Sequence, residues 1–266
     1  MRGQSTVVDG TLALVVVSAT VGLLLTAPAP ASTDSRATET ATALQTATVT
    51  VEADGRTHHG TPAALLAHGA VARVTLADEA LAASYHPSRD ALTRATDRVA
   101  RHRASGVRVR AVWEPYPDAP LSGRVAVGER PPPSGSVDAA VTTLPAPDVG
   151  RMRPPNATYD ALGATVARAT VRFVVPPALV ERAAYDEGAR TALDTRLARV
   201  EGALADFETD GEDGRAAPPD VAVDRLESRL GERVAADLRE RYDSPRAARD
   251  ALSVRDVTLV VRTWSR

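Results

Sequence analysis

An uncharged apolar run over residues 10–27 constrains this 266-residue chain more than any other feature. Eighteen residues at a helical rise of ~1.5 Å per residue reach roughly 27 Å, about the thickness of a bilayer's hydrocarbon core. The polar side chains in the run are hydroxyls, which can bond back to the carbonyls of their own helix. Pro28 and Pro30 then end the helix. The run therefore predicts a single transmembrane helix that acts as a signal anchor.

The charge around this run predicts its orientation. Arg2 is the basic residue that precedes the run, and most of the chain follows it. Positive charge favours the cytoplasmic side of a membrane. We therefore expect a single-pass protein of the cell membrane, with a cytoplasmic N-terminus and an extracellular C-terminal domain.

Two other interpretations of the N-terminus stay open. Ala29-Pro30-Ala31 has the small-x-small form that precedes a secretory cleavage site, here between Ala31 and Ser32. Arg2-Gly3-Gln4-Ser5, followed by a short polar stretch and the apolar run, resembles the class III processing site of archaeal pilin and archaellin precursors. That resemblance implies cleavage between Gly3 and Gln4, with the helix retained as a membrane anchor and polymerisation stem.

The rest of the chain is expected to form an α+β fold with a mainly antiparallel sheet and several amphipathic helices. Residues 1–27 hold the processing site and the transmembrane helix, 28–45 form a low-complexity stalk, and 46–266 form an extracytoplasmic domain with a loop break at 208–220. Alternating and periodic patterns predict strands at 47–52, 107–113, 123–127, 136–142 and 257–264, and helices at 63–72, 88–103, 158–174, 178–206, 220–242 and 244–252.

Two further expectations concern the sheet. Residues 107–143 read as an antiparallel meander, because three strand patterns follow one another there with breaks between them. The closing strand, 257–264, is apolar on both faces, so it is placed centrally in the sheet.

Composition excludes several kinds of chemistry. The chain has no cysteine, and all 32 of its basic residues are arginine. Disulfides, thiol nucleophiles, thiolate metal sites and Schiff-base lysines are therefore absent. The net charge is −2 and aromatic residues make up 3% of the chain, so we expect no nucleic-acid partner.

Charge is distributed unevenly along the chain. Residues 89–172 hold 13 arginines and 8 acidic residues, whereas residues 181–243 hold 10 arginines and 17 acidic residues. Ordinary solvated faces explain this difference, and they are the favoured interpretation of the basic run Arg94, Arg98, Arg101, Arg103, Arg108 and Arg110. The alternative is a bipolar surface that pairs subunits or docks a partner.

No linear motif predicts a catalytic residue, a metal site or a cofactor. The five histidines show no spaced ligand pair, and the glycines show no pattern that would hold a phosphate. We therefore interpret the histidines as surface or cap residues, and the stretch Asp210–Gly214 as a solvated acidic loop. The chain is expected not to be an enzyme.

Two other local features are binding or modification candidates. Asn156-Ala157-Thr158 is a sequon for N-glycosylation at Asn156. The string Trp113-Glu114-Pro115-Tyr116-Pro117 ends a strand, so Trp113 and Tyr116 are candidates for an exposed binding edge or for aromatic residues that cover the core.

Several strings together resemble an uncharacterised haloarchaeal family of membrane-anchored proteins. They are the N-terminal Arg-Gly-x-Ser-Thr-Val-Val-Asp stretch, Trp113-Glu-Pro-Tyr-Pro, Gly128-Glu-Arg-Pro-Pro and the closing Val-Val-Arg-Thr-Trp. The resemblance implies a non-enzymatic membrane-anchored protein, a pilin-like or accessory component of a pilus or secretion-type surface assembly, with sister pilin-like subunits as partners. The alternative is a secreted or anchored binding module with no filament role.

Overall fold

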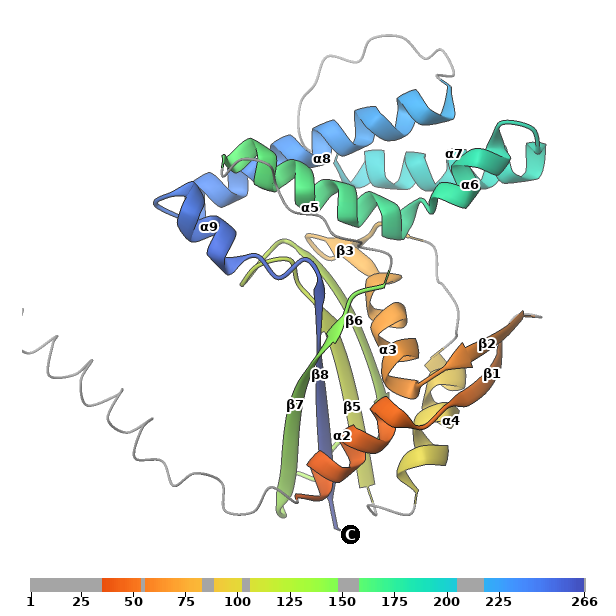
Figure 1. Cartoon of the computed structure of the whole chain (residues 1–266), viewed down its shortest axis with the longest axis vertical. Coiled ribbons are helices and arrows are strands. Elements are labelled where there is room, and N and C mark those ends of the chain that lie inside the picture. The colour runs from red at the N-terminus through yellow and green to blue at the C-terminus, as the bar shows by residue number, and fades with distance from the viewer. Residues whose placement is uncertain are drawn as a thin grey trace, which may run out of the picture. The chain divides into compact units, whose positions relative to one another are not determined.

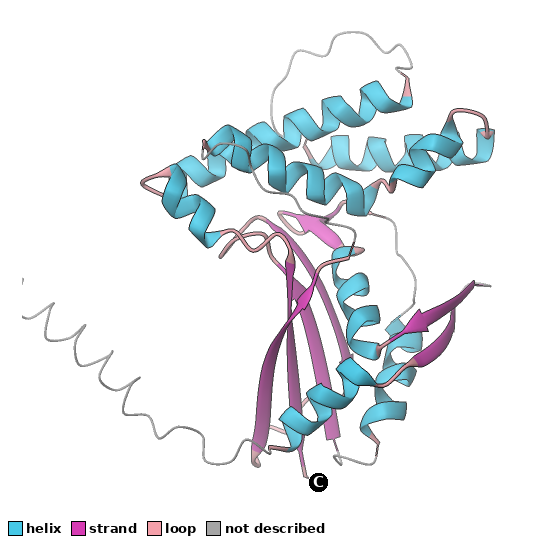
Figure 2. Cartoon of the chain, viewed as in Figure 1, coloured by secondary structure: helices cyan, strands magenta, loops and turns pink. Residues whose placement is uncertain are grey.

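Residues Arg36–Arg266 form one compact unit in the computed structural model (Figure 1). The structure describes residues 35–53, 56–82, 89–101, 106–147, 158–204 and 218–265. A six-stranded sheet lies at the centre of this unit, with one group of helices along a face of the sheet and a second group at its end (Figure 2).

The central sheet is antiparallel throughout. Its spatial order is β4-β3-β6-β5-β8-β7. The strands are β3 (Val74–Leu76), β4 (Glu79–Ala80), β5 (Gly106–Trp113), β6 (Leu121–Gly128), β7 (Val137–Pro145) and β8 (Asp256–Trp264).

Three helices cover one face of this sheet. They are α2 (Arg36–Thr46), α3 (Pro62–Val71) and α4 (Arg89–Ala100). Helix α2 packs on β7 and β8, α3 packs on β5 and β6, and α4 packs on β6. A separate hairpin of β1 (Val49–Ala53) and β2 (Arg56–Gly60) lies against α4.

The second group of helices follows β7 in the chain. It comprises α5 (Tyr159–Val174), α6 (Pro177–Ala183), α7 (Glu187–Ala203), α8 (Pro219–Arg241) and α9 (Pro245–Ala251). Helices α5 and α8 pack closely because Gly163 meets the backbone of Gly231: a Cβ built at Gly163 would lie 2.3 Å from the Gly231 carbonyl oxygen.

Local capping explains where several helices begin. The side chains of Thr61, Thr158, Asp186 and Ser244 each accept a hydrogen bond from a backbone N–H in the first turn of the helix that follows. Such bonds satisfy donors that have no partner inside the helix.

The predicted α+β class with an antiparallel sheet agrees with the structure, but its transmembrane part requires a correction. Among the residues that the structure describes, no helix is both long enough and apolar enough to cross a membrane. The run at 10–27, from which that helix was predicted, lies outside the described residues.

Three smaller predictions were also wrong. Residues 36–45 belong to α2 rather than to a stalk, because Ala37, Ala41 and Leu44 form an apolar stripe that is buried. The 178–206 helix is divided into α6 and α7 at the Asp186 cap. The 107–143 meander is interrupted, because β8 lies between β5 and β7. The prediction that this closing strand, β8, lies inside the sheet is confirmed.

Candidate functional site

The six-stranded sheet has one face packed under helices and one face exposed. Along β5, β6 and β8 the buried side chains alternate with exposed or half-buried ones, as a sheet covered on one side requires. Val109, Val125 and Val261 point into the core. The residues between them point to the opposite side, which we call the outer face.

Four arginines lie at outward positions on three neighbouring strands. Arg262 of β8 is directly opposite Arg108 of β5. Arg110 is two residues further along β5, and Arg124 of β6 is its diagonal neighbour, since Arg110 pairs with Ala126. Diagonal neighbours of this kind lie roughly 7–8 Å apart, within the reach of long side chains. We call this group of four the arginine face.

The arginine face is not neutralised by its surroundings. Among the residues that the structure describes, none of the four arginines forms an ion pair. Arg110, Arg124 and Arg262 are exposed. Of the outward positions on β5, β6, β7 and β8, the acidic one is Asp256, at the end of β8. Like charges directly opposite each other destabilise a sheet, so the Arg108–Arg262 pair has a cost to folding.

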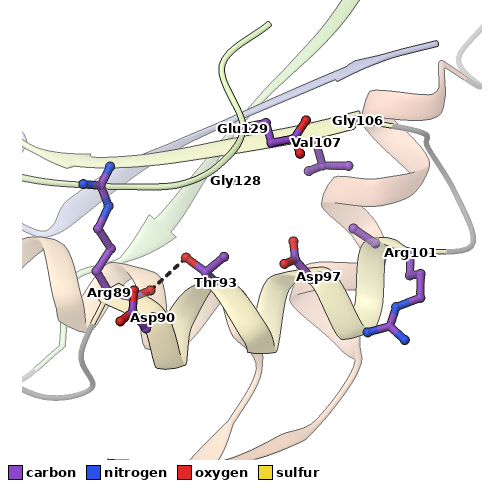
Figure 3. A pocket seen from close by; sticks show the side chains of 10 residues that line it. Arg89, Asp90, Thr93, Asp97, Arg101, Gly106, Val107, Gly128 and Glu129 are labelled. Carbon is purple, nitrogen blue, oxygen red and sulfur yellow. Dashed lines mark hydrogen bonds between the residues drawn. The ribbon is translucent and has the colours of Figure 1, made fainter. Parts of the chain in front are cut away.

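A second feature is a cavity of about 790 Å³ between α4 and the ends of β5 and β6. Figure 3 shows Thr93 and Asp97 on the side of α4 that faces the strand segments carrying Val107 and Glu129. Asp90 lies in the first turn of α4, next to Arg89. The Nε of Arg89 donates to the carbonyl oxygen of Ala126 at 2.9 Å, which ties the start of α4 to β6.

The groups that line this cavity do not form a catalytic arrangement. The Thr93 hydroxyl donates to the carbonyl oxygen of Arg89 at 2.9 Å, a local helix bond, and is not paired with a base. The lining otherwise combines carboxylates, guanidinium groups and small apolar side chains. Its size is within the range of small-molecule sites, but its chemistry favours no one ligand.

The two aromatic residues that were candidates for a binding edge or for covering the core are buried, which agrees with the second alternative. Trp113 and Tyr116 are both 0% exposed. The indole Nε1 of Trp113 donates to the Val254 carbonyl oxygen at 2.8 Å, and its ring meets Phe173 edge to face. Burial, together with the nearby Asp237 carboxylate, raises the pKa of Tyr116, so its hydroxyl stays protonated. Both residues join the sheet to the helices rather than face a partner.

The three histidines in the described part of the chain are divided between β2 and α3. His58 and His59 lie on β2 and His68 lies on α3, and the Thr50 hydroxyl is 3.0 Å from Nδ1 of His59. The described residues include no group of three or more side chains that could hold a metal ion. His86 and His102 lie outside the described residues, as do Gly3, Gln4, Ala31, Ser32, Asn156 and the acidic stretch Asp210–Gly214.

The sequence drew attention to two of the four arginines of the arginine face, but they were interpreted as part of a solvated face. Arg108 and Arg110 fall in the predicted strand at 107–113, but the sequence grouped them with Arg94, Arg98 and Arg101, which the structure places on or next to α4. Arg124 and Arg262 were missed as part of a site. Both residues lie in segments that the sequence predicts as strands, but the strand order that brings them together was not visible in the sequence.

Comparison with known proteins identifies a family. No curated protein and no solved structure matches the chain. The model of a family of unknown function, DUF7284, matches residues 8–264, which is nearly the whole chain. The chain therefore belongs to DUF7284, a family of unknown function.

Proposed function

We propose that this chain is a non-enzymatic subunit that binds an acidic segment of a partner protein through its arginine face. The observation that carries the proposal is the placement of four outward arginines on β5, β6 and β8, without an ion pair among the described residues. A sheet with one bare, cationic face has a surface that an anionic partner can cover.

The loss of folding stability that the arginine face causes supports a binding role. Arg108 and Arg262 are directly opposite each other, an arrangement that a purely structural sheet avoids. Threonine or valine at either position would suit a strand better. A local rule broken at an exposed place is typical of a functional surface, because binding then compensates for the loss in stability.

The chemistry of the face favours carboxylates over nucleic acid. Guanidinium groups bind carboxylates in a bidentate manner, and a row of them along strands suits an extended acidic segment. Nucleic-acid surfaces usually add aromatic side chains on which bases stack. On the outer face, the aromatic residue at an outward position is Trp264, which is 5% exposed and lies against Gly106.

A binding measurement with matched variants tests this proposal. We expect the full chain to bind a fluorescent oligoglutamate peptide, and we expect Arg108→Gln with Arg262→Gln to weaken that binding by about fivefold, or ~1 kcal/mol. The control is Arg182→Gln with Arg246→Gln, which removes the same charge from exposed positions on α6 and α9. Fluorescence anisotropy at low and high salt measures both.

Two results would contradict the proposal. One is an equal loss of affinity in both double variants, because net charge alone would then explain binding. The other is tighter binding of an oligonucleotide of equal charge than of the peptide. Raising the salt concentration should weaken peptide binding, since exposed charges are screened over ~10 Å at 0.1 M salt.

A subunit of this kind fits an accessory place in a larger assembly. The pilin-like form of that role rests on Arg2-Gly3-Gln4, which lies outside the described residues. The arginine face supports a role in an assembly independently of that motif, because binding through this face requires only that the partner has an acidic surface.

A further inference from the structure

The two edges of the six-stranded sheet differ in their protection. One edge is β4, which is two residues long, carries the exposed Glu79 and lies against α7. The other edge is β7, which is nine residues long and pairs on one side with β8 (Figure 1). Short strands, charges and covering helices are the usual protections of an edge. β7 is long and exposed, and the protections it carries are one charged residue, Asp138, and a proline at its last position, Pro145.

Exposed apolar side chains lie along this edge. Val141 is 68% exposed and Val137 is 36% exposed, and both point to the outer face of the sheet. Lysine, the charge most often used to block edge pairing, is absent from the chain. The unpaired backbone groups of such a strand can bind another strand in the same sheet.

We propose that β7 pairs antiparallel with β7 of a second copy of this chain, about a two-fold axis at Val141. The sequence of β7 is complementary to itself in this register. Val141 meets its own symmetry mate, which removes a valine that is 68% exposed from water. The acidic Asp138 is opposite Leu144 and never opposite another Asp138, so no like charges meet. The remaining pairs join Ala139 to Thr143, Ala140 to Thr142 and Val137 to Pro145.

The pairing has a consequence for the outer face. A two-fold axis between antiparallel strands is perpendicular to the sheet, so both outer faces lie on the same side of the dimer. The two arginine faces then flank an uncharged strip made of the two β7 strands, whose outward residues are valine, alanine, threonine and proline. The dimer contact itself does not depend on what the arginines bind.

A charge exchange at the symmetry axis tests the pairing and its register. We expect the full-length wild-type chain to sediment as a dimer, and Val141→Lys and Val141→Glu each to shift it to the monomer, because each variant places like charges opposite each other. An equal mixture of Val141→Lys and Val141→Glu should recover the dimer. Sedimentation velocity measures all four samples. Circular dichroism should show that the variants stay folded, since the replaced side chain is mostly exposed.

A matched control uses Tyr185, which is 80% exposed and lies between α6 and α7. Tyr185→Lys adds the same charge away from β7 and should leave the dimer unchanged. A wild-type monomer would overturn the proposal, and so would a dimer that persists in Val141→Lys. A persistent dimer would mean that the chain self-associates through another segment, such as the apolar run at 10–27, which the variant leaves unchanged. Failure of the mixture to associate would overturn the Val141 register, because lysine and glutamate would then not lie opposite each other; a wild-type monomer would leave the strand of a different protein as the occupant.

Discussion

Asp186 shows how one side chain can change an element that periodicity alone predicts. The apolar spacing over 178–206 indicates one helix, yet the chain bends at 184–186 and a new helix begins. The Asp186 Oδ1 accepts the backbone N–H of Ala189 at 2.8 Å, and Arg182 approaches its other oxygen at 3.3 Å. An Asp followed by a first-turn Glu is a capping signal, but it competes with a strong helical pattern, so only the structure decided between them.

The pKa of Asp186 makes this cap dependent on pH. The hydrogen bond from Ala189, followed by that from Arg182, lowers the pKa of Asp186 below its usual value. A carboxylate with a lowered pKa contributes stability above its unfolded pKa of about 4, and loses that contribution as the pH falls through the folded pKa. Asp186→Ala should therefore lower the melting temperature at neutral pH, and the difference from wild type should shrink in acid.

Asp186→Asn separates the cap from the charge. Asparagine keeps an oxygen acceptor for the Ala189 N–H, so this variant should be more stable than Asp186→Ala at neutral pH. It has no carboxylate to titrate, so its own cap should be unchanged by acid. Thermal unfolding followed by circular dichroism at both pH values is the measurement. Equal melting temperatures for Asp186→Ala and wild type at neutral pH would contradict the capping role.

At the scale of elements, sequence patterns predicted helices better than strand partners. The helices at 63–72, 158–174 and 220–242 appear close to their predicted bounds as α3, α5 and α8. Their periodicity and caps are local, so they can be read from neighbouring residues. The short strands β3 and β4 were missed, because two or three residues carry no period. The contact of α5 with α8 was also invisible, since it depends on two glycines distant in sequence.

The contact between Gly163 and Gly231 predicts a contrast between two glycine substitutions. Gly163→Ala would place a Cβ within 3 Å of three α8 atoms, so we expect a loss of stability of ~1–3 kcal/mol from overpacking. Gly202→Ala in α7 meets no atom within 4 Å and should stabilise the fold by ~0.4–1 kcal/mol. Urea unfolding of both variants checks this, and a neutral Gly163→Ala would contradict the close helix packing.

At the scale of the whole molecule, the chain combines a covered sheet with a bare cationic face. Uneven charge along the sequence was interpreted as ordinary solvated faces, with a bipolar docking surface as the alternative. The charge pattern could not locate the arginine face, because Arg262 comes more than 130 residues after Arg124 in the chain and is brought beside the arginines of β5 only by the pairing of β8 with β5. Non-local strand order of this kind is fixed by packing of the complete sheet, which single-sequence patterns do not record. The class of the fold was therefore predictable, and the composition of the candidate site was not.

The most direct test of the central claim is to find where a bound acidic peptide lies. An oligoglutamate peptide carrying a photoreactive group would be cross-linked to the full chain, and the adducts would be mapped by mass spectrometry. The account predicts adducts on β5, β6 and β8, around Arg108, Arg124 and Arg262, and their loss in the Arg108→Gln and Arg262→Gln double variant. Adducts concentrated on α4, around Arg94 and Arg98, would contradict it, because the binding surface would then lie on the helices instead of on the bare face of the sheet.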